Sequence, residues 1–145
     1  MINVDFLKTL GVVDLISEKH KQLRHNMMST IDEQCDDHFS SIEVFLISLV
    51  AFKPMSVSET ARYMAISRQA AHKHVKQLIN LGYIELTTSE SNRRDKIVTP
   101  TEKGLLLSKQ FNAIKQQKEA KLEALIGTQD YQVIKAIFEK NWDIT

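Results

Sequence analysis

Residues 56–104 read SVSETARYMAISRQAAHKHVKQLINLGYIELTTSESNRRDKIVTPTEKG, and this stretch decides the fold. Ser56 and Glu59 have the spacing of a capping box, in which each side chain bonds the other residue's backbone amide at a helix start. We therefore expect a short helix from Ser56 to about Met64. The whole chain holds only four glycines and two prolines, which favours helices over a turn-rich β fold.

A second helix follows a turn at residues 65–66. Ser67 is expected to cap this helix and Gly82 to end it. On a wheel of 100° per residue, Ala71, Val75 and Leu78 share one side, which we expect to be buried. The opposite side and the N-terminal end carry Ser67, Arg68, Gln69, His72, Lys73 and Lys76. Arg and Gln can read base edges in the DNA major groove, and Lys neutralises phosphate.

A small β-hairpin is expected after this helix. Residues 83–88 alternate as a strand does, and residues 96–99 read as the returning strand. The polar turn between them holds Arg93 and Arg94. Arginines on a narrow projection suit the DNA minor groove, where negative potential is concentrated. Together, the two helices and the hairpin predict a winged helix-turn-helix, with small Ala61 where the helices cross.

The segments on either side of this unit read as further helices. Before it, we expect a short lead-in broken at Gly11, followed by a long helix that ends near Ser29. A polar loop over 30–39 comes next. The buried helix after this loop is expected to be capped by Ser40 or Ser41 and ended by Pro54. After it, we expect a long helix capped by Thr99 or Thr101 and stopped at Gly127, then a last helix over about 129–142.

The charge is unevenly distributed, although the chain is nearly neutral at +1. Residues 53–104 hold nine Lys/Arg and five Asp/Glu, whereas the rest holds ten and thirteen. A basic middle between acidic flanks suits a segment that binds a polyanion. Composition is that of a soluble single domain, with 43% hydrophobic and 26% charged residues. We see no membrane span, signal peptide or disulfide framework, and we expect a cytosolic protein.

The quoted stretch resembles the DNA-binding segment of the MarR family of bacterial transcription regulators. The resemblance rests on an ordered set of short motifs: SRQ at 67–69, LGYI at 81–84, the arginine pair at 93–94 and TEKG at 101–104. It implies a mainly α fold with a small β-hairpin wing in one domain, 1–145. Segments 1–39 and 101–145 would then be dimerisation helices (about 5–29 and 101–142), and 40–100 the DNA-binding lobe.

The resemblance also implies a function. Such proteins are homodimers that bind pseudo-palindromic double-stranded DNA, and many are repressors released by a small-molecule effector. The eight residues expected to contact DNA are Ser67, Arg68, Gln69, His72, Lys73, Lys76, Arg93 and Arg94. Two positions depart from the family pattern: His74 stands where a core leucine is usual, and Asn92 replaces the aspartate before the wing arginines.

Sensing chemistry at Cys35-Asp36-Asp37-His38 is an alternative reading of the sequence. The thiol could react with peroxide, or these residues, with His20 and His25, could bind zinc. Acidic neighbours raise a thiol pKa, which opposes reactivity. The resemblance opposes both ideas, because the family's redox sensors carry cysteine near the start of the first long helix and its zinc sensors use histidines in the segment matching 101–126, which has none. We expect no metal site and no cofactor.

Two other classes of function remain to be compared. A winged-helix protein-interaction module without DNA binding would expose an apolar patch on the helix over 67–82, where this sequence places charge. An enzyme would need a catalytic motif, and we find no G-x-S-x-G, phosphate-binding glycine loop or convincing Cys/His/Asn set. The sequence therefore favours a DNA-binding regulator.

Overall fold

The computed structural model describes residues 4–89 and 94–144. Four helices and one short strand precede the recognition helix candidate: α1 (Val4–Leu7), α2 (Val12–Gln34), α3 (Ser41–Phe52), β1 (Met55–Ser56) and α4 (Val57–Met64). The remaining elements are α5 (Arg68–Asn80), β2 (Ile84–Thr87), β3 (Ile97–Pro100), α6 (Glu102–Ile126) and α7 (Thr128–Glu139). The expected mainly α fold with a hairpin wing is confirmed.

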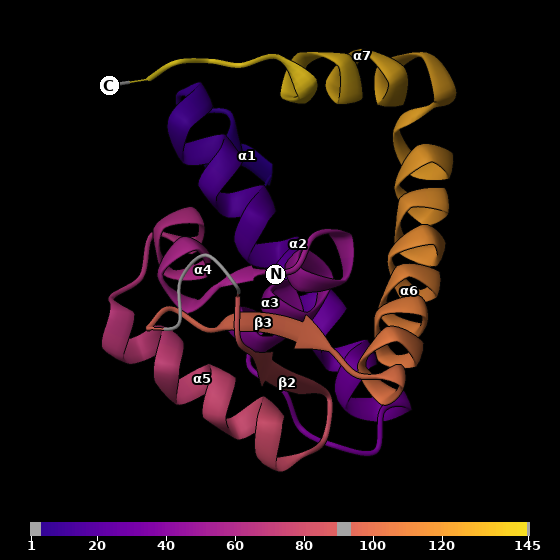
Figure 1. Ribbon diagram of the computed structural model, residues 1–145. Helices are drawn as coiled ribbons and strands as arrows, with labels where there is room; N and C mark the ends of the chain where they lie inside the picture. Colours follow the sequence, from indigo (N-terminus) through magenta and orange to yellow (C-terminus); the bar gives the residue numbers. More distant parts are fainter. Residues whose placement is uncertain (1–3, 90–93, 145) are drawn as a thin grey trace.

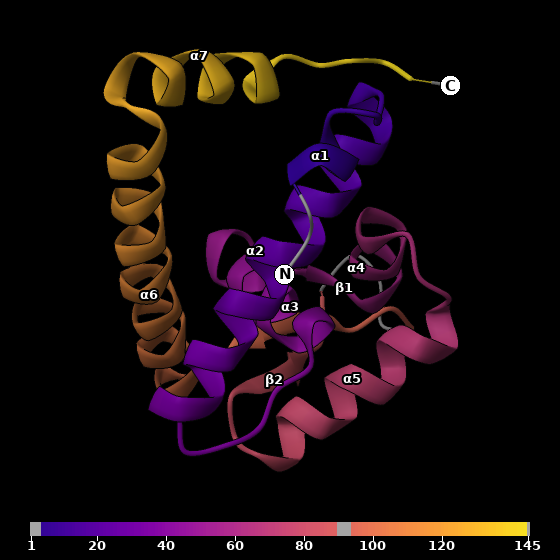
Figure 2. The same cartoon turned by 180° about the vertical axis from the view of Figure 1, so that it is seen from behind.

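The arrangement separates two ends of the molecule. Long α6 runs along one side and α7 crosses at its end; α1 lies toward that same end of the molecule, whereas α5 lies at the opposite end (Figure 1). Seen from behind, α2 and α3 lie between α6 and the α4–α5 pair (Figure 2). Within the described residues, every helix is too short or too polar to span a bilayer.

The sheet is antiparallel with strand order β1-β3-β2. In the hairpin, Leu86 pairs with Val98, which also pairs with Met55 of β1. We did not predict β1, because two residues carry no alternation pattern and their only strand partner lies about forty positions later. This bridge joins the wing to the start of α4.

Capping serines set the starts of three helices: Ser56 and Ser67 as expected, and Ser40 rather than the alternative Ser41. Ser40 and Ser56 each form a full capping box, with Glu43 and Glu59 respectively. Ser67 accepts a hydrogen bond from the Ala70 amide at the start of α5. Because these bonds satisfy amides that a helix leaves unpaired, they fix where α3, α4 and α5 begin.

Three expectations about boundaries were wrong or left open. Residues 30–34 are helical rather than loop, because Ile31 is fully buried in the core while its acidic neighbours face solvent. Thr101, not Thr99, caps α6, since strand pairing extends as far as Pro100. The last helix ends at Glu139, where the Trp142 indole donates to a carbonyl of the final turn.

One apolar core holds the α5 side of the molecule. Its fully buried side chains come from α2, α3, α5, the wing and α6, and include Ile31, Leu46, Ile47, Leu78, Val98 and Phe111. Phe39, in the segment between α2 and α3, packs edge-on against both Tyr83 and Phe111. Contacts in this core therefore link α5 to α2 and α6, two helices that extend toward the end of the molecule opposite α5 (Figure 1).

Candidate nucleic-acid interface

Helix α5 has the two faces that its sequence predicts. Ala71, Val75 and Leu78 are buried, as expected. Exposed positions include all six expected contacts on this helix: Ser67, Arg68, Gln69, His72, Lys73 and Lys76. The helix N-terminus, where Arg68 and Gln69 lie, adds amides without intrahelical partners and the positive end of the helix dipole. The exposed face therefore combines positive charge with hydrogen-bond donors.

The turn before α5 is tight. Ala65 adopts a left-handed conformation with φ 55°, and its amide donates to carbonyls of the last turn of α4. Ala61, on α4, is buried at the crossing with α5, as its small size predicts. The two helices thus form a helix-turn-helix.

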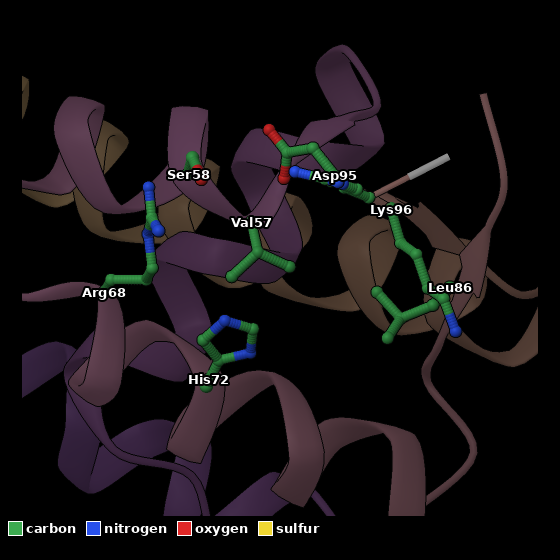
Figure 3. A pocket seen from close by; sticks show the side chains of 8 residues that line it. Val57, Ser58, Arg68, His72, Leu86, Asp95 and Lys96 are labelled. Carbon is green, nitrogen blue, oxygen red and sulfur yellow. The ribbon is translucent and has the colours of Figure 1, made fainter. Parts of the chain in front are cut away.

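A basic hollow lies between α4, α5 and the hairpin. Its volume is about 580 Å³, and Arg68 and His72 enter it from α5 while Leu86 lines it from β2 (Figure 3). Arg94 and Lys96 add two positive charges to that of Arg68, and Asp95 supplies one carboxylate. Four basic groups against one acid make this hollow suited to a polyanion.

The structure describes only some of the wing residues that the sequence predicts to contact DNA. Arg94 is exposed and lines the hollow beside Lys96. Arg93 and Asn92 lie outside the described residues. Lys96 is not among the contacts that the sequence predicts, because it reads there as the first residue of the returning strand. Its position two residues after Arg94 was the available signal.

His74 has a specific partner that the sequence does not reveal. Its Nδ1 lies 2.7 Å from Oε2 of Glu43, on α3. A histidine that borders the buried face of this helix is expected to be partly buried with a local hydrogen bond; the partial burial is confirmed, but the hydrogen bond is long-range rather than local. The two residues are 31 positions apart, so no local pattern links them.

The Cys35 region does not resemble a reactive or metal-binding centre. Burial, Asp36 and Asp32 all raise the pKa of the Cys35 thiol, in the direction expected from its neighbours. A higher pKa leaves less thiolate at neutral pH and slows reaction with oxidants. In the part of the chain that the structure describes, no three His, Cys, Asp or Glu side chains gather as a metal site would require.

A second hollow lies away from α5, where α2, α3, α4 and α6 meet. It has a volume of about 400 Å³ and an apolar wall that includes Met27, Met28, Phe45 and Tyr63, the last two stacked 6.2 Å apart. Three basic residues line it: His20, Arg24 and Lys115. Lys115 donates to Ser48 Oγ at 3.0 Å, and burial lowers the pKa of its amine.

A helix-turn-helix joined to a hairpin wing defines a winged-helix protein. The sequence profile of the MarR family matches residues 42–95, from α3 into the wing. No curated protein sequence matches the chain closely. The family match is therefore limited to residues 42–95, whereas the chain as a whole has the fold of solved MarR-family structures. This family consists of transcription regulators rather than enzymes.

Solved structures share this fold at low sequence identity. Wild-type MarR from E. coli has a TM-score of 0.78 at 11% identity, with 90% of this chain and 96% of that chain covered. The transcriptional regulator BldR from Sulfolobus solfataricus gives 0.74 at 14%, with 96% of each chain covered. The heme sensor protein PefR from Streptococcus agalactiae gives 0.62 at 19%, covering 89% and 90%.

Proposed function

We propose that this protein is a homodimeric transcription regulator that binds a pseudo-palindromic double-stranded DNA site, acts as a repressor and is released by a small-molecule effector. The observation that carries the DNA-binding part is the exposed face of α5. Its six candidate contacts all face solvent beside a basic hollow that continues to the wing. Domain boundaries follow: 40–100 forms the DNA-binding lobe, and 1–39 with 101–145 form the dimerisation helices.

Each contact has a role in this proposal. Arg68 and Gln69, at the start of α5, reach base edges in the major groove. Lys73 and Lys76 neutralise phosphates along the groove, and Ser67 and His72 donate or accept beside them. Arg93 and Arg94 contact the minor groove or its phosphates from the wing.

A second copy of the chain is the proposed partner of the α1–α7 end. Large apolar side chains are exposed there, including Phe6, Val13, Ile134, Ile137 and Phe138. Exposed apolar area of this extent, gathered at one end, indicates an interface rather than a solvated surface. Pairing two chains there leaves both α5 helices available for half-sites about one DNA turn, roughly 34 Å, apart.

The effector is proposed to occupy the hollow beside Lys115. Aromatic and methionine side chains suit an apolar body, and the three basic groups suit an anionic end. Helices α3 and α4 form part of the walls of this hollow, and α4 packs against α5. An effector that fits best when α3 and α4 move apart would therefore favour dimers in which the distance between the two α5 helices does not match the DNA half-sites. Release then follows as a population shift.

The competing proposal, a protein-interaction module, has less support. Among the described residues, the large apolar side chains that are exposed lie outside α5. A protein partner at α5 would therefore have to be strongly acidic rather than apolar. Such a partner would compete with DNA for the same cations. The two proposals therefore differ in which ligand, DNA or an acidic protein, binds α5 more tightly at physiological salt.

The test is fluorescence anisotropy of the purified protein against a randomised duplex pool and its own upstream DNA, at low and physiological salt. Sedimentation of the complex gives the number of chains per duplex. Tight, salt-dependent binding that prefers one duplex, with two chains on it, supports the proposal. Weak binding without preference at both salts would contradict it.

A further inference from the structure

Glu43 connects the start of α3 to the middle of α5. It is the third residue of α3, and only 7% of it is exposed. Its Oε1 accepts from the Ser40 amide at 3.0 Å, which completes the capping box. Its Oε2 lies 2.7 Å from Nδ1 of His74, in the middle of α5. Both carboxylate oxygens are therefore used, one within α3 and the other across to α5.

The contact is directional and shielded. The side chains of His74 and Glu43 are 16% and 10% exposed. A carboxylate without a proton only accepts, so Nδ1 of His74 carries the hydrogen in this bond. A short bond to a charged acceptor is among the stronger hydrogen bonds, and a buried carboxylate that loses its donor is costly.

Apolar packing alone fixes the position of α5 less sharply. Ala71, Val75 and Leu78 hold the helix on the core, but apolar burial has no preferred direction. The helix can rotate or slide a little while these side chains remain buried. Base readout, by contrast, needs contact groups placed to within about 0.5 Å. His74 lies between His72 and Lys76 in sequence, so a bond at residue 74 restrains the whole reading face.

We propose that Glu43 and His74 form a positioning pair, which sets the rotation of α5 on α3 and thereby its preference among DNA sequences. This inference rests on the proposed function, because it requires α5 to read DNA. It assigns neither residue a contact with DNA. The pair is expected to affect the preference for one duplex over others more than the affinity shared by all duplexes.

Three substitutions of His74 separate bond geometry from packing and helix propensity. In His74→Asn, the amide nitrogen takes the place of Nδ1 and can still donate to Glu43. In His74→Gln, the matched control, the amide lies one bond further out, near the place of Nε2. His74→Leu fills the space without a donor. Gln favours helices more than Asn does, so propensity alone predicts the opposite order from the hydrogen bond.

The experiment measures the affinity of each variant for a duplex selected by the wild-type protein and for random-sequence duplex. The measured quantity is the affinity for the selected duplex divided by the affinity for random-sequence duplex. We expect this ratio to fall about tenfold in His74→Leu and His74→Gln, and to stay within about twofold of the wild-type value in His74→Asn. Circular dichroism establishes that each variant is folded. If His74→Leu fails to fold, the comparison of Asn with Gln carries the test.

Two results would overturn the inference in different ways. If the wild-type protein prefers its selected duplex but Asn and Gln change the ratio equally, or Leu leaves it unchanged, the positioning role is wrong and the proposed function stands. If the wild-type protein has no sequence preference, the proposed function fails and this inference fails with it.

Discussion

Gly104 lies directly against the backbone of Tyr83. A Cβ added to Gly104 would fall 2.0 Å from the Tyr83 carbonyl oxygen. That oxygen also accepts from the Thr101 amide, and the Lys103 ammonium lies 4.4 Å from the centre of the Tyr83 ring. The TEKG and LGYI motifs are thus the two sides of one contact, which joins the start of α6 to the turn between α5 and β2.

Gly104→Ala is expected to destabilise the fold by about 2–3 kcal/mol, because backbone atoms must shift to admit the methyl group. The gain of about 1 kcal/mol in helix propensity is smaller than this cost. Urea unfolding followed by circular dichroism measures the difference. Gly11→Ser is the control, since an added Cβ there meets nothing within 4 Å. Equal stability of the Gly104→Ala protein and the wild type would show that the contact is not tight.

Lys76→Ala is expected to weaken binding to all duplexes by a similar factor and to lower the slope of log affinity against log salt by about one. The physical reason is that one fewer phosphate is neutralised and about one fewer counterion is released. Titrations at four or more salt concentrations measure the slope. Lys109→Ala, at an exposed position on α6, should leave it unchanged. An identical slope for both variants would remove Lys76 from the interface.

Gln69→Ala is expected to act on sequence preference instead. Its amide can pair with two atoms of an adenine edge, a contact worth about 1–3 kcal/mol of discrimination between bases. Affinities for the selected duplex and for its single-base variants measure this effect. We expect preference to relax at one position of each half-site while binding to random duplex changes little. Equal losses on every duplex would assign Gln69 to phosphate contact.

The hollow beside Lys115 is expected to bind anionic aromatic molecules. The probe is 1-anilinonaphthalene-8-sulfonate, which pairs a sulfonate with fused rings and fluoresces when removed from water. Replacing both Arg24 and Lys115 with Met should weaken its binding about tenfold or more, because two cations are lost and the apolar wall is kept. Lys109→Met, at an exposed position on α6, is the control. Unchanged binding by the double variant would place the probe elsewhere.

Local signals in the sequence predicted much of this fold. Capping residues at Ser40, Ser56 and Ser67 and the glycine at 82 mark helix ends through bonds made within a few residues, and such bonds leave a readable spacing. The same reasoning failed at residues 30–34. There, polar composition suggested a loop, but one buried apolar residue, Ile31, is enough to keep an exposed turn helical.

Features made by distant residues could not be predicted in this way. The Thr101 cap depends on how far β3 pairs with β2, and the β1 bridge depends on a strand about forty residues away. The partner of His74 comes from another helix. For the candidate interface, the wheel correctly predicted which α5 side chains are exposed, whereas Lys96 lines the same hollow as Arg68 and His72 only because the hairpin folds back beside α5.

If the exposed face of α5 is the DNA interface, removal of its contact groups must abolish most of the affinity for DNA. The variant with Gln69, His72, Lys73 and Lys76 all changed to Ala is compared with Lys109→Ala/Lys121→Ala, which also removes two formal positive charges, at exposed positions of α6. Anisotropy on the selected duplex should show a loss of about hundredfold or more for the first variant and little change for the second. Wild-type affinity in a folded four-residue variant would contradict the account.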